Sequence, residues 1–239
     1  MTGLADDRMN PQATGSAITA STKLSRAAQR EATARAAVRC LTRADPALGA
    51  LIKKIGPHRP IITHNPFVAL VGSIVQQQVS MSAAAAVQKR LKALCARGRV
   101  TPAAILELSD HNLRSAGLSR QKAKYIRALA EHFASGTLSS RKLRGMTDEE
   151  VIVATTRVKG VGRWTAEMLL IFCLERPDIW PIDDLGLRKA VRNFLGLGAL
   201  PEMETMEATG EPWRPFRTYA SWYLWRSLEG PFMPGVALA

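Results

Sequence analysis

Apolar residues recur along this chain at the spacing of helices rather than strands. The body of the sequence consists of one amphipathic stretch after another, separated by glycine, proline or small polar residues. No stretch alternates strictly between apolar and polar positions, and no dipeptide typical of a two-residue β-hairpin joins two such stretches. The pattern predicts an all-α protein built from many short helices.

Capping residues mark several of the expected helix starts. Asn65 precedes Pro66, which places a capping side chain before a proline at the first helical position. Thr147 is followed three positions later by Glu150, the spacing of a capping box. Further expected features are one or two short helices over 35–56 with a break near Asp45, a helix starting at Ser80 or Ser82, and a helix from Ser119.

Length and composition indicate how the chain divides into a tail and a folded domain. The chain has 239 residues, and residues 1–30 are rich in small polar residues with little apolar periodicity. We therefore expect a tail over 1–30 and one helical domain over 31–239. No run of about 18 apolar residues is present, so we expect no membrane span and an intracellular location.

Cysteine usage argues against a disulfide framework or a metal centre. The three cysteines, Cys40, Cys95 and Cys173, lie far apart and have neither a zinc-site nor an iron–sulfur spacing. We expect no cofactor and no metal held by side chains.

Net charge is more informative about partners. Lys and Arg total 33 against 20 Asp and Glu, a formal net charge of +13. An excess of this size favours polyanionic partners, nucleic acid first and an acidic membrane surface second.

The stretch VKGVGRWTAEMLL predicts a helix–hairpin–helix over about 148–174. Gly160 and Gly162 permit a tight turn and a close approach by another chain. The free amides at the start of the second helix form a seat for phosphate, with Lys159 and Arg163 adding positive charge. Val161 is expected to pack between the two helices. This turn predicts a contact with a DNA backbone that carries no sequence readout.

Together with other segments, this stretch resembles the helix–hairpin–helix DNA glycosylase superfamily, most closely its 3-methyladenine DNA glycosylase II, or alkylpurine, branch. The matching segments are FVALVGSIVQQQVSMSAAAAV, AGLSRQKAKYIRALA, VKGVGRWTAEMLL, WPIDDLGLRKAVRNF and WRPFRTYASWYLW, in the order of the family. The resemblance runs from about residue 45 to 229. It implies two helical subdomains with the active-site cleft between them.

The resemblance places the catalytic aspartate at Asp184, with Asp183 as the competing candidate. We expect one of the two carboxylates to cap the following helix and the other to face the pocket. Family members that also cut the DNA strand carry a lysine where this chain has Trp164. The resemblance therefore implies a monofunctional enzyme.

The family pattern also assigns the base pocket and the wedge that fills the gap left by a flipped base. Aromatic walls fall on Trp164 and Trp225, with Trp222 as a further candidate, and a position that is aromatic in some members is Met168 here. The wedge falls on Gln78, with Gln77 next.

The implied activity is repair of alkylated duplex DNA by a monomer. The enzyme would flip alkylated purines of the 3-methyladenine and 7-methylguanine type and hydrolyse the N-glycosidic bond. Two alternatives remain open: a non-catalytic helix–hairpin–helix DNA-binding protein, and a glycosylase for oxidised or mismatched bases.

Overall fold

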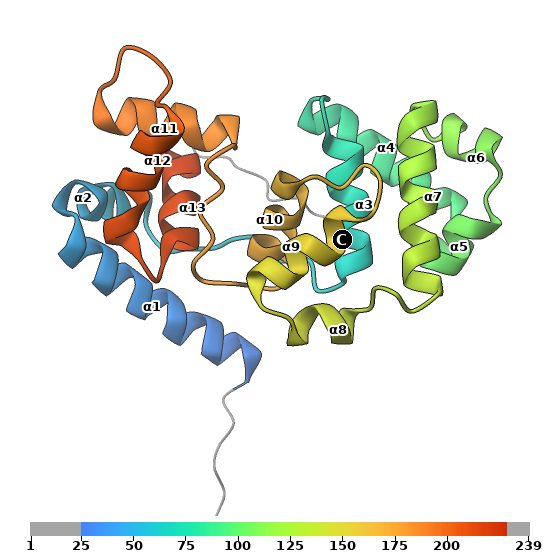
Figure 1. Cartoon of the computed structure of the whole chain (residues 1–239), viewed down its shortest axis with the longest axis horizontal. Coiled ribbons are helices and arrows are strands. Elements are labelled where there is room, and N and C mark those ends of the chain that lie inside the picture. Colours follow the sequence, from blue (N-terminus) through green and yellow to red (C-terminus); the bar gives the residue numbers. More distant parts are fainter. Residues whose placement is uncertain (1–24, 229–239) are drawn as a thin grey trace, which may run out of the picture.

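The fold is entirely helical in the part of the chain that the computed structural model describes, residues 25–228 (Figure 1). This confirms the predicted all-α class. The helices are α1 (Arg26–Ala44), α2 (Pro46–Ile55), α3 (Pro66–Gln76), α4 (Met81–Leu94), α5 (Pro102–Glu107), α6 (Asp110–Ser115), α7 (Arg120–Ala134), α8 (Ser140–Gly145), α9 (Asp148–Thr156), α10 (Arg163–Phe172), α11 (Leu185–Leu195), α12 (Met203–Gly210) and α13 (Arg217–Leu228), with two short 3₁₀ helices, η1 (Ala96–Gly98) and η2 (Glu211–Trp213).

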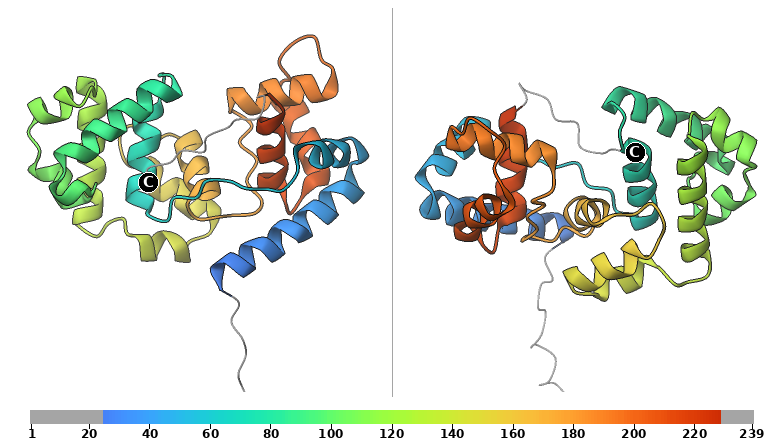
Figure 2. Two further views of the ribbon diagram at one scale, coloured as in Figure 1. Left: turned by 180° about the vertical axis from the view of Figure 1, so that it is seen from behind. Right: turned by 45° about the horizontal axis from the view of Figure 1, so that its top comes forward.

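The helices form two lobes, as predicted (Figure 1). A central lobe contains α3–α10, in which α3 packs against α4, α7 and α10. A terminal lobe brings together both ends of the described chain, with α13 packing against α1, α2 and α11. Two extended segments, residues 56–65 and 173–184, cross between the lobes, and Figure 2 shows the first of them from behind.

Each lobe has large, fully buried side chains. In the central lobe α3 is buried along almost its whole length, and Phe67, Leu70 and Ile74 are at most 2% exposed. In the terminal lobe Trp213 and Tyr223 are the largest such side chains. The aromatic residues near the end of the chain are therefore largely structural.

The cap predictions are confirmed where the sequence gave a single candidate. Asn65, Ser119 and Thr147 each accept hydrogen bonds from the first turn of their helices, and Thr147 forms the full capping box with Glu150. Of the two candidates for α4, Ser80 is the cap.

The first helix differs from its prediction. Residues 26–44 form one helix of 19 residues, so α1 begins inside the stretch assigned to the tail. Alanine-rich sequence without an apolar periodicity can still form a helix when one side packs against neighbouring helices. The break near Asp45 is confirmed, because Asp45 caps α2. The rest of the predicted tail, residues 1–24, lies outside the described residues.

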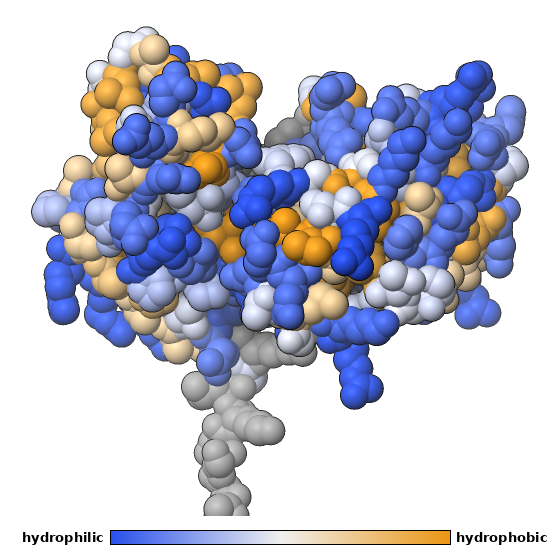
Figure 3. All heavy atoms as spheres, viewed as in Figure 1, coloured by the Kyte–Doolittle hydropathy of each residue, from blue (hydrophilic) through white to orange (hydrophobic). Residues whose placement is uncertain are grey.

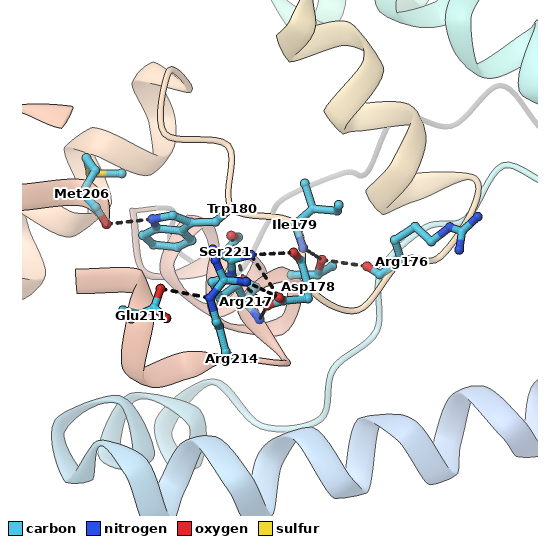
Figure 4. Close-up of polar contacts among 10 residues, drawn as sticks. Arg176, Asp178, Ile179, Trp180, Met206, Glu211, Arg214, Arg217 and Ser221 are labelled. Carbon is cyan, nitrogen blue, oxygen red and sulfur yellow. Dashed lines mark hydrogen bonds and ion pairs between the residues drawn. The ribbon is translucent and has the colours of Figure 1, made fainter. Parts of the chain in front are cut away.

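The segment from α10 to α11 is fixed to the start of α13 by a polar network (Figure 4). Asp178 accepts hydrogen bonds from the guanidinium groups of Arg217, at 2.7 and 3.0 Å, and Arg214, at 2.9 Å. The Thr218 hydroxyl accepts from the Ile179 amide at 2.9 Å. This network holds Asp178 and Ile179, midway along the segment, against the start of α13.

The surface is mostly hydrophilic and carries several separate apolar groups. Figure 3 shows hydrophobic residues over the loop between α11 and α12, where Leu195, Leu197 and Met203 are each about 40% exposed. A notch separates the two lobes in the same view. Among residues 25–228, none of the helices has the length and apolar character that crossing a membrane requires.

Candidate active site

The predicted hairpin joins α9 to α10 through residues 157–162. Gly160 has a φ of +92°, in the region that favours glycine. A Cβ built at Gly160 would lie 2.2 Å from the ring of Tyr125 on α7, so this glycine also allows a close approach between two elements. Val161 is 4% exposed and packs inward as expected. The first glycine thus serves the fold of the turn.

Gly162 has a different role. It precedes α10 with a φ of −91°, which other residues adopt readily, and nothing lies within 4 Å of a Cβ placed there. As the N-cap of α10 it offers no side chain, so no capping group covers the first amides of the helix. These amides have no capping side chain and carry partial positive charge. The position is suited to a phosphate.

The two basic residues beside the turn are both exposed, but they differ in their surroundings. Arg163 forms ion pairs with Glu149, at 3.5 Å, and Glu167, at 3.2 Å. Part of its charge is therefore neutralised within the protein. Lys159 is exposed on the turn itself. The structure therefore distinguishes two cations that the sequence analysis treats alike, because Arg163 is paired with acidic residues of α9 and α10.

Asp184 lies where the two lobes meet, and it receives an indole from each. Trp164 of α10 donates its Nε1–H to Oδ2 at 2.7 Å, and Trp225 of α13 donates its Nε1–H to Oδ1 at 2.8 Å. Oδ1 also accepts from the amide of Leu187 at 2.6 Å, so that Asp184 caps α11. Three N–H donors hold this half-buried carboxylate in one orientation.

The prediction that the two neighbouring aspartates have separate roles is wrong. We expected one carboxylate to cap the helix and the other to face the pocket, whereas Asp184 contacts both the helix amide and the two indoles. A carboxylate has two oxygens with several acceptor positions, so a single residue can satisfy both sets of donors. The Asp183 side chain is exposed.

The predicted pocket residues fall into two groups. Trp164 and Trp225 both donate to Asp184, and Met168 lies one turn after Trp164 on α10 and is 8% exposed. Trp225, 6% exposed, stacks on Phe172 with ring centroids 5.9 Å apart. Trp222 instead faces His58, at 4.7 Å between centroids. Trp222 and Trp225 line a cavity of about 30 Å³ together with Phe172.

A larger cavity, of about 350 Å³, is lined by Trp222 and by residues of α1. His58 and Tyr219 line it together with Phe172. Burial lowers the pKa of His58 to about 4, so its ring is neutral at pH 7. Sequence analysis gave no indication of this cavity, because its walls come from four distant segments.

Sequence analysis also missed Glu167. It lies one turn after Arg163 on α10, is 5% exposed, and its Oε2 atom is buried without a hydrogen-bond partner among the described residues. Burial raises its pKa to about 7; Arg163 opposes this shift, and Asp183 and Asp184 add to it. In the sequence, the only indication of a buried carboxyl group is that Glu167 stands within an apolar run.

The predicted wedge residues lie at the end of α3, opposite the hairpin. Gln78 is exposed and has a φ of +56°, an uncommon conformation for a residue other than glycine. The side chain of Gln77 turns back and donates to the carbonyl of Gly160 at 3.0 Å. The two residues line a hollow of about 490 Å³ together with Lys122, Tyr125 and the hairpin turn.

A metal site would need a cluster of suitable side chains. Within residues 25–228, histidine, cysteine, aspartate and glutamate side chains form no group of three or more that could hold an ion.

Comparisons with known proteins identify the same superfamily as the sequence resemblance. The family model described as HhH-GPD superfamily base excision DNA repair protein matches residues 71–215. DNA-3-methyladenine glycosylase 1 of Schizosaccharomyces pombe is 35% identical over 182 residues, covering 74% of this chain and 80% of the relative.

Two solved structures are similar over most of the chain. The S. pombe 3-methyladenine DNA glycosylase in complex with abasic DNA has a TM-score of 0.76 at 33% identity, covering 83% of this chain and all of that one. A DNA-3-methyladenine glycosidase from Bacillus halodurans has a TM-score of 0.71 at 35% identity, covering 80% and 88%.

Proposed function

The chain belongs to the HhH-GPD superfamily of base excision DNA repair proteins, and we propose that it is a DNA glycosylase that removes alkylated purines from duplex DNA. The single observation that carries this proposal is the Asp184 carboxylate, held between Trp164 and Trp225 at the junction of the two lobes. The names of the relatives, which are 3-methyladenine glycosylases, support the substrate class.

The hairpin would hold the DNA strand. Its open α10 amides and Lys159 face solvent without a capping side chain, which suits a phosphate oxygen. The S. pombe structure contains DNA, and this supports the assignment of a DNA partner. A grip of this kind fixes the position of the strand and leaves base recognition to the pocket.

Asp184 would act on the sugar of a flipped nucleotide. A carboxylate offers about four acceptor positions, of which N–H donors occupy two at Oδ1 and one at Oδ2. Oδ2 therefore retains a position for the reacting sugar. In the reaction the C1′–N bond breaks, the base leaves with the bonding pair, and water adds its oxygen to C1′ and releases a proton. The negative charge of Asp184 would stabilise the oxocarbenium-like sugar between these events.

The aromatic side chains would select the leaving base. Purines alkylated at N3 or N7 carry a positive charge, so they attract aromatic faces and leave without protonation. Trp164 and Trp225 lie beside the carboxylate and supply such faces, and Met168 adds a softer wall than an aromatic residue would. We assign Trp222 to the outer part of this wall, because it is half-buried and lines the same small cavity as the more deeply buried Trp225.

Gln78 would be the wedge that enters the DNA stack when the base leaves. It is exposed at the end of α3 and lines the same hollow as the hairpin turn. Gln77 is half-buried and hydrogen-bonded to the hairpin, so its amide is less available for this role.

We further assign a monofunctional reaction, without strand cleavage. Trp164 has no amine that could form a Schiff base with the abasic sugar. Borohydride treatment during turnover should therefore trap no covalent enzyme–DNA adduct.

Release of methylated bases tests the proposed function. Wild-type protein incubated with methylated duplex DNA should release free 3-methyladenine or 7-methylguanine, measured by chromatography. Asp184→Asn should reduce the rate at least a hundredfold, since loss of one charge-stabilising group typically has this effect. Asp183→Asn, a matched control one residue away, should retain the rate. If the wild type binds DNA but releases no base, the chain is a binding protein and the proposal is wrong.

A further inference from the structure

The loop that carries Gln78 is bound by side chains from two other elements. This loop, residues 77–80, joins α3 to α4 and is here named the wedge loop. Gln77 Nε2 donates to the Gly160 carbonyl at 3.0 Å and to the Thr165 hydroxyl at 3.4 Å. One amide thus connects the wedge loop to both the hairpin turn and the first helical turn after it.

A lysine holds the same loop from the other side. Lys122 Nζ, on α7, donates to the carbonyls of Val75 at 2.7 Å and Gln77 at 2.6 Å. These carbonyls lie at the C-terminal end of α3, where the last C=O groups have no partner within the helix and a positive charge is favourable. Partial burial lowers the pKa of Lys122, in keeping with a group directed into the protein.

The residue between these anchors has an uncommon backbone conformation. Gln78 has a φ of +56°, which costs an L-residue about 1–2 kcal/mol. Such a conformation persists where the surrounding structure imposes it. The anchors on the preceding residue, Gln77, provide that constraint, while the Gln78 side chain itself is exposed.

The position of the hairpin is fixed by the same neighbours. Tyr125 of α7 packs against Gly160, and the two lie in the wall of the hollow that Gln78 also lines. The phosphate seat and the wedge are therefore held at a set separation by Gln77, Lys122 and Tyr125. A wedge can displace a base only if it enters the stack at the right distance from the gripped strand, and a displacement of about 1 Å can reduce a rate a hundredfold.

We propose that Gln77 and Lys122 are positioning residues, which hold Gln78 at a fixed distance from the hairpin so that it can displace the damaged base. This inference rests on the proposed function and adds roles that differ from the wedge and from the catalytic group. It concerns extrusion of the base only, so bond cleavage on a base that is already unpaired should not need these contacts.

Two substrates separate extrusion from chemistry. One duplex carries a single 7-methylguanine opposite cytosine, and the other carries it opposite a tetrahydrofuran abasic analogue, where no base pair must be broken. Gln77→Leu should reduce the single-turnover rate on the paired substrate about tenfold or more and change the rate on the unpaired substrate by less than about threefold. Equal losses on both substrates would overturn the proposal, because they indicate a general structural defect.

A double-mutant comparison identifies the route of the effect. If Gln77 acts through Gln78, then Gln77→Leu combined with Gln78→Ala should be no slower than Gln78→Ala alone on the paired substrate. The proposal would be contradicted if the rate losses of the two single variants multiplied in the double variant. It would also be contradicted if Gln78→Ala alone left the rate on the paired substrate unchanged. Gln76→Leu is the matched control, since the side-chain amide of Gln76 has no hydrogen-bond partner among residues 25–228. It should leave both rates unchanged.

Lys122→Met provides an independent variant should Gln77→Leu lower the thermal midpoint. It removes both carbonyl contacts from α7 and should show the same selective loss on the paired substrate. A wild type that releases 7-methylguanine from neither duplex would refute the proposed function. Normal release by every variant would refute only the positioning role.

Discussion

Replacing Gly160 with alanine should destabilise the fold, whereas the same change at Gly162 should not. At Gly160 the φ of +92° strains any L-residue by about 1–2 kcal/mol. A new Cβ would lie 2.2 Å from the Tyr125 Cγ and Cδ2 atoms, well inside the usual carbon–carbon contact of about 3.5 Å. Tyr125 must move, and overpacking of this kind typically costs about 1–3 kcal/mol. We expect a total loss of roughly 2–5 kcal/mol in the free energy of unfolding.

Gly162→Ala is the matched control for Gly160→Ala. The φ at Gly162 is −91° and nothing lies within 4 Å of the added methyl group. Its free energy of unfolding should stay within about 1 kcal/mol of wild type, since a slightly poorer cap is offset by a less flexible unfolded chain. The methyl group would occupy the space in front of α10, so DNA affinity should fall about fivefold or more.

Urea unfolding followed by tryptophan fluorescence measures the stabilities, and fluorescence anisotropy with a labelled duplex measures the affinity. A double-mutant cycle with Tyr125→Ala isolates the clash with the ring, because Gly160→Ala should then retain only the backbone strain and the 2.8 Å approach to the remaining Cβ of residue 125. The reasoning is refuted if Gly160→Ala unfolds at the wild-type urea concentration. It is also refuted if Gly162→Ala binds DNA as tightly as wild type does.

Three further predictions concern Glu167, Trp164 and Lys159. The folded protein binds the Glu167 proton more tightly than the unfolded chain, so this residue stabilises the fold below its ordinary pKa of 4.5, and the contribution is lost as pH rises through about 7. In Glu167→Gln the decline in unfolding free energy between pH 4.5 and 8 should be smaller by about 1–3 kcal/mol, and an unaltered pH profile would contradict this. Trp164→Phe removes one donor from Asp184 Oδ2 and should slow single-turnover base release by about tenfold, so an unchanged rate would mean that the indole only fills space. Lys159→Ala should weaken binding to undamaged duplex and reduce the slope of log affinity against log salt by about 0.9, whereas an identical slope would exclude a phosphate contact at this residue.

The sequence was most informative where the controlling interactions are local. The cap at Asn65, the capping box of Thr147 and Glu150, and the hairpin with its buried Val161 all depend on residues within a few positions of one another. Such interactions produce recognisable patterns over short stretches. The order of the helices and the two-lobe architecture followed from these patterns together with the family resemblance.

Contacts between distant segments could not be predicted in the same way. Gln77 reaches Gly160 across 83 positions, and Trp225 reaches Asp184 across 41. Neither contact has a local pattern, so the single residue Asp184 was not expected to serve both as cap and as acceptor for two indoles. The burial of Glu167 likewise depends on the packing of α10, and an acidic residue within an apolar run is compatible with either exposure or burial.

The start of α1 shows a third limit. Residues 26–44 have many alanines and few large apolar side chains, and the stretch lacks the periodicity on which helix prediction depends. Its helix is supported by contacts with α2 and α13. Weak local patterns are routinely decided by packing partners that the sequence alone does not identify.

Binding to a cationic sugar analogue tests the central claim most directly, because it measures the charge of Asp184 against the sugar without turnover. The measurement compares the affinity for duplex DNA containing a pyrrolidine in place of one deoxyribose, which carries a positive charge, with that for an uncharged tetrahydrofuran duplex. Two opposite charges about 4 Å apart at a partly buried site interact by about 4 kcal/mol at most, so wild type should prefer the pyrrolidine by about tenfold or more. Asp184→Asn should lose that preference while binding the tetrahydrofuran duplex as wild type does. An equal preference in both proteins would contradict the account, since it would locate the stabilising charge elsewhere.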